Sequence, residues 1–133
     1  MATFLYFIGT VNLLGVVMLF AALREDVHDL LLRRWTRILR ADEPARHGNG
    51  SRLWTVWAAV GTLGFAWLNL RAAGGNPAWM AEVVRMDVLV YGAFEVMAIV
   101  GTASRKFGPG MWVCHPLWIG QGGWGLAVLL NGT

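Results

Sequence analysis

The first long apolar stretch of the chain is "ATFLYFIGTVNLLGVVMLFAAL", residues 2–23, and it contains no charged residue. As an α-helix at 1.5 Å per residue it would extend about 33 Å, enough to cross the hydrocarbon core of a bilayer. A cleaved signal peptide would carry Lys or Arg before its apolar run, and here the Arg residues come only after it. We therefore expect a retained membrane-spanning helix.

Three more apolar stretches follow, at about residues 53–70, 86–103 and 111–130. The 133-residue chain is 56% hydrophobic and 14% charged, whereas about a quarter of the residues in a soluble domain are charged. It also has eight Trp residues, a residue type that favours the membrane–water interface. The sequence therefore predicts an all-α integral membrane protein, with residues 1–133 forming a single domain that is a bundle of four transmembrane helices.

The segment between the first two spans, residues 24–52, is rich in Arg. Within residues 24–41 the apolar side chains recur at helical spacing with Arg between them, which predicts an amphipathic helix on the cytoplasmic membrane surface. Lys and Arg concentrate in segments 24–52 and 104–110, so the positive-inside rule places both loops in the cytoplasm and both termini outside. This is the topology of a bacterial inner-membrane protein. Because topology accounts for the positive charge, the expected partner is the lipid bilayer rather than a nucleic acid.

A carboxyl group, Glu95, lies near the expected bilayer midplane in the third span. A charged, unpaired carboxylate costs several kcal/mol at that depth, and no Lys or Arg lies within any of the four expected spans. We therefore expect Glu95 to be neutral and hydrogen-bonded inside the bundle. Its reachable partners are Asn12, Thr62 and Tyr91, which lie at similar depth or on the same helix face.

His115 is the second candidate, near the cytoplasmic end of the fourth span. Together with Glu95 it could supply acid–base or hydrogen-bonding groups inside an apolar pocket. The residues expected to bind a ligand are Asn12, Thr62, Tyr91, Glu95, His115 and Trp118. The spacing of Cys and His residues predicts no metal site, and no motif indicates a cofactor.

The outer end of the third span carries Asp87, which is close in sequence to Arg71, Glu82 and Arg85. We interpret these charges as interfacial ion pairs that fix the outer loop. Asp87 and Glu95 are eight residues apart, about 12 Å along a helix, so we do not expect the two carboxyl groups to act on one reacting atom.

Three functions are compatible with this pattern. The favoured hypothesis is a non-catalytic subunit of a membrane complex or a homo-oligomer, because the fourth span is rich in glycine and no complete catalytic set is present. The second is a binder or isomerase-like modifier of a hydrophobic small molecule, such as a lipid, isoprenoid, quinone or sterol, that uses Glu95 and His115. The third is an oligomeric proton-coupled transporter built around Glu95.

Overall fold

The computed structural model describes residues 1–35, 37, 49–105 and 108–132, and within them it contains helices and no strand. The elements in chain order are α1 (Ala2–Ala21), α2 (Glu25–His28), the π-helix η1 (Asp29–Trp35), α3 (Asn49–Ala73), α4 (Pro77–Ala103) and α5 (Met111–Asn131). The predicted all-α class is therefore confirmed. Of the segment 24–41, α2 and η1 cover residues 25–35, and most of the remainder lies outside the described residues.

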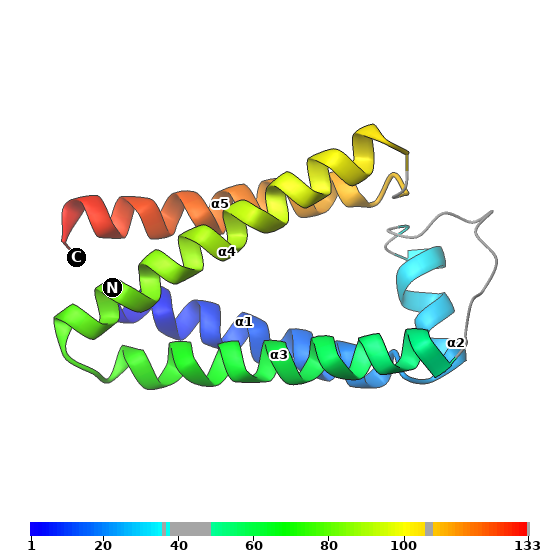
Figure 1. Cartoon of the computed structure of the whole chain (residues 1–133), viewed down its shortest axis with the longest axis horizontal. Coiled ribbons are helices and arrows are strands. Elements are labelled where there is room, and N and C mark those ends of the chain that lie inside the picture. Colours follow the sequence, from blue (N-terminus) through cyan, green and yellow to red (C-terminus); the bar gives the residue numbers. More distant parts are fainter. Residues whose placement is uncertain (36, 38–48, 106–107, 133) are drawn as a thin grey trace.

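The long helices form two antiparallel pairs, α1 with α3 and α4 with α5 (Figure 1). The pairs meet at the end that holds both termini and the α3–α4 turn, and they diverge toward the end where α2 and η1 lie (Figure 1). At the diverging end, the backbone N–H of Gly110 donates to the carbonyl of Arg37 at 3.0 Å. This bond ties the segment after η1 to the start of α5.

The turn between α3 and α4 explains why α4 begins well before the apolar stretch at 86–103. The side chain of Asn76 caps α4 by accepting from the backbone N–H of Trp79 at 2.9 Å. Pro77 occupies the first helical position, where its fixed φ suits the helix and its missing N–H costs nothing. Helix α4 therefore starts at Pro77 and carries polar residues in its first turns.

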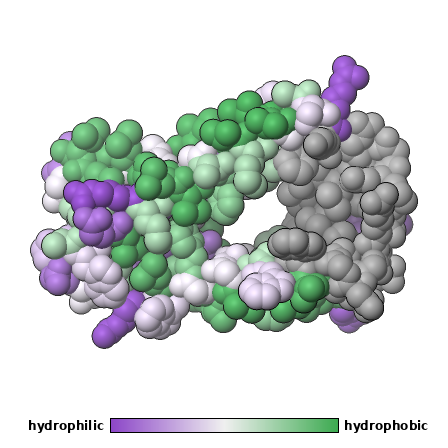
Figure 2. Space-filling view, viewed as in Figure 1, coloured by the Kyte–Doolittle hydropathy of each residue, from purple (hydrophilic) through white to green (hydrophobic). Residues whose placement is uncertain are grey.

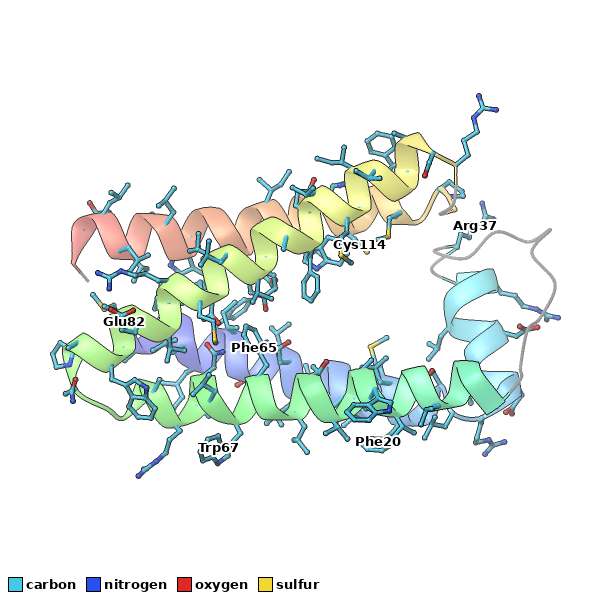
Figure 3. All side chains as sticks on the ribbon, in the orientation of Figure 1. Phe20, Arg37, Phe65, Trp67, Glu82 and Cys114 are labelled. Atoms are coloured by element: carbon cyan, nitrogen blue, oxygen red, sulfur yellow. The ribbon has the colours of Figure 1, made fainter. Side chains whose placement is uncertain are left out.

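Large apolar side chains are exposed on all four long helices. The face of the molecule in Figure 2 shows such side chains as green areas on both helix pairs. Leu14 is 62% exposed and Leu89 is 73% exposed, and Trp67 points outward from α3 in Figure 3. Among the helices in the described part of the chain, α1 is the one that is both long enough and apolar enough to cross a membrane. The helices α3, α4 and α5 are less apolar, so the four-span arrangement stays a prediction.

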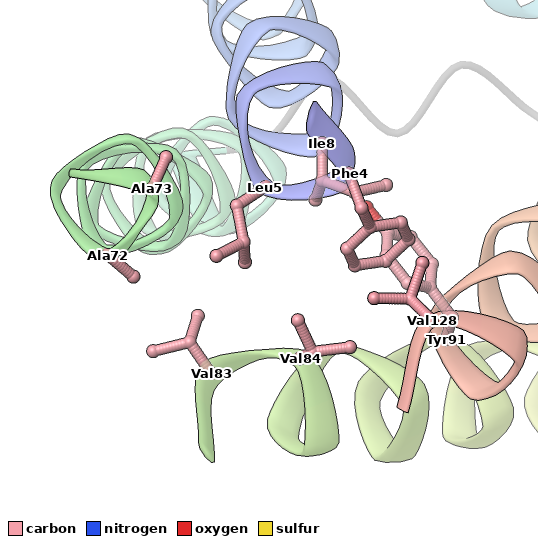
Figure 4. Close-up of a cluster of buried hydrophobic side chains, with 9 residues drawn as sticks. All are labelled: Phe4, Leu5, Ile8, Ala72, Ala73, Val83, Val84, Tyr91 and Val128. Atoms are coloured by element: carbon pink, nitrogen blue, oxygen red, sulfur yellow. The ribbon is translucent and has the colours of Figure 1, made fainter. Parts of the chain in front are cut away.

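The buried core lies where the two helix pairs meet (Figure 4). Its members are Phe4, Leu5, Ile8, Ala72, Ala73, Val83, Val84, Tyr91 and Val128. Two glycines allow the close packing around it. A Cβ on Gly9 would lie 2.6 Å from Cγ of Leu70, and a Cβ on Gly125 would lie 3.0 Å from Cζ of Phe4. Larger residues at these positions would push α1 away from α3, or α5 away from α1.

Candidate functional site

A cavity of about 390 Å³ lies between α1, α3 and α4. It is lined by Asn12, Ala58, Gly61, Thr62, Phe65, Val90 and Phe94. Phe65 points from α3 toward the space between the helix pairs in Figure 3, and Figure 2 shows an opening between the same pairs. The cavity exists because the pairs diverge and because the residues at positions 58 and 61 are small, so side chains from α3 do not fill the gap.

Asn12 links this cavity to the polar interior of the bundle. Its amide nitrogen donates to the carbonyl of Ile8 at 2.9 Å and to the Tyr91 hydroxyl at 3.2 Å. The ring of Tyr91 packs edge-on against the cavity residues Phe65 and Phe94, with centroid distances of 6.3 and 6.4 Å. Because both amide hydrogens of Asn12 are used within the protein, its amide oxygen is the group that it can offer a ligand, as an acceptor.

Glu95 and His115, the two candidates from the sequence, are brought together by the packing of α4 on α5. Oε1 of Glu95 lies 2.7 Å from Nδ1 of His115, and the two side chains are 14% and 9% exposed. Nε2 of His115 lies 3.5 Å from the Thr102 hydroxyl. The predicted partners of Glu95 were Asn12, Thr62 and Tyr91, and this prediction was wrong because Glu95 contacts His115. Asn12 and Tyr91 bond each other, and Thr62 lines the cavity.

A carboxylate on Nδ1 of an imidazole and a hydroxyl on Nε2 form an arrangement that fixes the ring and shares a proton with it. Here the hydroxyl contact is long, and neither Glu95 nor His115 lines the cavity. The neighbouring residue Phe94 does line it and packs against Trp118, with ring centroids 5.8 Å apart. Of the expected ligand residues, Asn12 and Thr62 thus line this cavity, and Trp118 packs behind its wall residue Phe94.

Asp87 is not the interfacial ion-pair residue that the sequence suggested. It is 0% exposed, and Oδ1 of its carboxyl group accepts from Nδ2 of Asn69, itself 0% exposed, at 3.1 Å. Arg85 instead pairs with Glu82 on the exposed side of α4. The prediction was wrong because residues two positions apart on a helix do not share a face, so Asp87 points inward when Arg85 points outward.

The inner face of α4 thus carries four polar residues, which we call the polar stripe: Asp87, Tyr91, Glu95 and Thr102. Each member contacts a polar side chain on another helix. Asp87 contacts Asn69 of α3, and Tyr91 contacts Asn12 of α1. Glu95 and Thr102 both contact His115 of α5. Sequence reasoning missed Asp87 and Asn69 as a buried pair. The spacing of four residues between Asp87, Tyr91 and Glu95 is the signal that could have placed them on one face.

Within the described residues, no three His, Cys, Asp or Glu side chains are grouped closely enough to hold a metal ion. No family model matches the chain, and neither a curated protein nor a solved structure is found to be similar to it.

Proposed function

We propose that this chain is a small integral membrane protein that crosses the bilayer with four helices and binds an uncharged hydrophobic small molecule between its two helix pairs. The observation that carries the proposal is the cavity between α1, α3 and α4. Its volume of about 390 Å³ falls within the range of small-molecule sites, roughly 300–1,000 Å³.

Membrane insertion is supported by the outer surface of the helix pairs. Side chains such as Leu14, Trp57, Leu89 and Leu130 are more than half exposed, and surfaces of this kind are covered by lipid or by another protein. Both termini lie at the end opposite α2 and η1 (Figure 1). That placement fits a bacterial inner-membrane topology in which the Arg-rich segment faces the cytoplasm and the termini face outward.

The chemistry of the cavity lining favours an uncharged ligand. None of the lining residues carries a charge, and Phe65 and Phe94 present aromatic rings. Asn12 and Thr62 offer hydrogen-bonding groups that suit a single hydroxyl or carbonyl group. A lipid, isoprenoid, quinone or sterol with one small polar group has this combination of properties.

The test is a variant that fills the cavity, Gly61→Leu. A Cβ on Gly61 meets no atom within 4 Å, so the larger side chain should be tolerated while it occupies the cavity that Gly61 lines. We expect photolabelling of the protein in nanodiscs by diazirine-bearing sterol, quinone or isoprenoid-alcohol probes to fall at least about ten-fold.

Gly64→Leu is the matched control, because Gly64 is on the same helix, is equally open and does not line the cavity. Its labelling should equal that of the wild-type protein. Equal labelling of Gly61→Leu and Gly64→Leu would show that no probe enters the cavity and would overturn the proposed function.

A homo-oligomer or subunit of a membrane complex is the second candidate, and the surface of α5 favours it. Gly120 and Gly123 are exposed, and a Cβ on either meets no atom within 4 Å. Such small residues allow another transmembrane helix to approach closely. We expect Gly120→Leu to lower the dimer fraction seen by cross-linking in membranes several-fold relative to Gly64→Leu. A wild-type protein that stays monomeric at every concentration contradicts this candidate.

A further inference from the structure

The contact between Asn69 and Asp87 leaves two buried oxygen atoms without a hydrogen-bond partner. Nδ2 of Asn69 donates both of its hydrogens, to the carbonyl of Phe65 and to Oδ1 of Asp87, each at 3.1 Å. Among the described residues, Oδ1 of Asn69 and Oδ2 of Asp87 have no partner, although both side chains are 0% exposed. Buried polar atoms of this kind are almost always satisfied in folded proteins.

The orientation of the Asn69 amide is fixed by the backbone carbonyl of Phe65. Exchanging its nitrogen and oxygen would place the amide oxygen against that carbonyl, which has no hydrogen to donate. The amide oxygen therefore needs a donor, and an ionised carboxylate has none to give. A protonated Asp87 has one hydroxyl hydrogen, and that single hydrogen would satisfy both unpartnered oxygens.

We propose that Asp87 and Asn69 together bind one proton, forming a neutral acid–amide pair in which the Asp87 hydroxyl donates to Oδ1 of Asn69. The pair then has two antiparallel hydrogen bonds, one in each direction, between α4 and α3. The ligand of this site is a proton, and the site does not depend on a molecule bound in the cavity.

Among the described residues, no hydrogen bond or ion pair joins a charged side chain to the Asp87 carboxyl group. Arg85, on the same helix, pairs with Glu82 on the exposed side, and Arg71 at the end of α3 is exposed. The titratable group that follows on the inner face of α4 is Tyr91, one helical turn away, and its hydroxyl bonds Asn12 of α1. The core residues contributed by α1 and α5 at this junction are apolar. In the described part of the chain, Asp87 has no ion-pair partner.

Loss of the proton has a structural consequence because the pair joins the two helix pairs. An ionised Asp87 would be desolvated, without a cation, and its free oxygen would have no donor. Asn69 is bonded to the carbonyl of Phe65, and Phe65 lines the cavity. Protonation therefore holds α3 and α4 together beside the cavity, and deprotonation favours their separation.

Infrared spectroscopy of the protein in nanodiscs tests the proton directly. At neutral pH we expect a carbonyl band from a protonated carboxyl group that is lost in Asp87→Asn and shifted to higher frequency in Asn69→Ala, which removes the amide donor. Glu95→Gln is the control that separates any contribution of Glu95, and it should leave the Asp87 band in place. If wild type and Asp87→Asn give the same carboxyl bands at neutral pH, the proposal is wrong.

A distance measurement tests the structural consequence and remains available if the infrared bands overlap. Spin labels at Leu63→Cys and Met97→Cys, in a Cys114→Ala background, would report the α3–α4 separation at exposed positions. We expect the distance to increase as the pH is raised in the otherwise unchanged protein. It should stay at the short value in Asp87→Asn, whose amide can donate to Asn69 as the acid does.

Two outcomes of the distance measurement would overturn the proposal. One is a distance that does not change with pH in the protein with Asp87. The other is a distance that shortens on adding Na⁺ or K⁺ at constant pH, since the two oxygens would then bind a metal cation and not a proton. The infrared and distance measurements both use the protein without a small-molecule probe. A negative photolabelling result for the cavity would therefore leave both of them unaffected.

Discussion

Replacing His115 with alanine is expected to lower the free energy of unfolding by about 1–3 kcal/mol, the usual cost of leaving a buried hydrogen-bonding group without its partner. The substitution removes the hydrogen bond of 2.7 Å to Glu95, whose other carboxyl oxygen, Oε2, already has no partner among the described residues. With its remaining partner gone, the Glu95 side chain, only 14% exposed, would have both oxygens unsatisfied. Reversible unfolding in mixed micelles, followed by circular dichroism, measures the loss.

Two further variants separate the pair from general packing damage. Glu95→Gln keeps an amide oxygen that can accept from Nδ1–H, so its cost should be smaller, below about 1 kcal/mol. The double variant Glu95→Leu/His115→Leu should cost less than the sum of its single variants, because neither polar group is then left buried alone. Strictly additive losses would show that Glu95 and His115 do not interact in the folded protein.

The positions of the long helices could be predicted from the sequence because each helix corresponds to one continuous run of apolar residues. The long apolar runs fall within α1, α3, α4 and α5, although α1 ends at Ala21, two residues before the run does. The starts of α3 and α4, at Asn49 and Pro77, precede the apolar runs at 53–70 and 86–103. Hydropathy cannot locate such starts, because a capping residue such as Asn76 sets the boundary and it lies in a polar segment.

The side-chain contacts of the polar residues could not be predicted from the sequence in the same way. Hydropathy and depth predicted Glu95 and His115 as candidates one by one, but their contact with each other depends on how far α4 and α5 are rotated about their own axes. The sequence assigned Asp87 to charges that are near it along the chain, and the structure buries it against Asn69, 18 residues earlier. Contacts between helices are set by tertiary packing, and one sequence contains no direct record of that packing.

The cavity is the feature that sequence reasoning was least able to anticipate. Asn12 and Thr62, two of the expected ligand residues, do line it, but it exists because the helix pairs diverge. Gly61 contributes by leaving space, and a glycine in an apolar helix is equally compatible with close packing, as Gly9 shows against Leu70. Only the arrangement of all the long helices distinguishes a glycine that faces empty space from one that faces a neighbour.

That arrangement depends on the core at the converging end, so Phe4→Ala should have the second large effect, a loss of about 3–5 kcal/mol in the free energy of unfolding. Phe4 is 1% exposed, and its ring packs edge-on against Trp124 of α5 at a centroid distance of 5.2 Å. It therefore connects α1 to the other helix pair, and truncation leaves a void where Gly125 lets α5 approach.

Leu14→Ala is the control for Phe4→Ala, because Leu14 is on the same helix and is 62% exposed. Its expected cost is below about 0.5 kcal/mol, typical of surface positions, and lipid would contact the shortened side chain as it contacts leucine. Both variants are measured by the same unfolding assay in mixed micelles. Equal losses of unfolding free energy for the two variants would mean that Phe4 does not hold the two helix pairs together. The cavity depends on the pairs being joined at that end, so its shape would then have no support there.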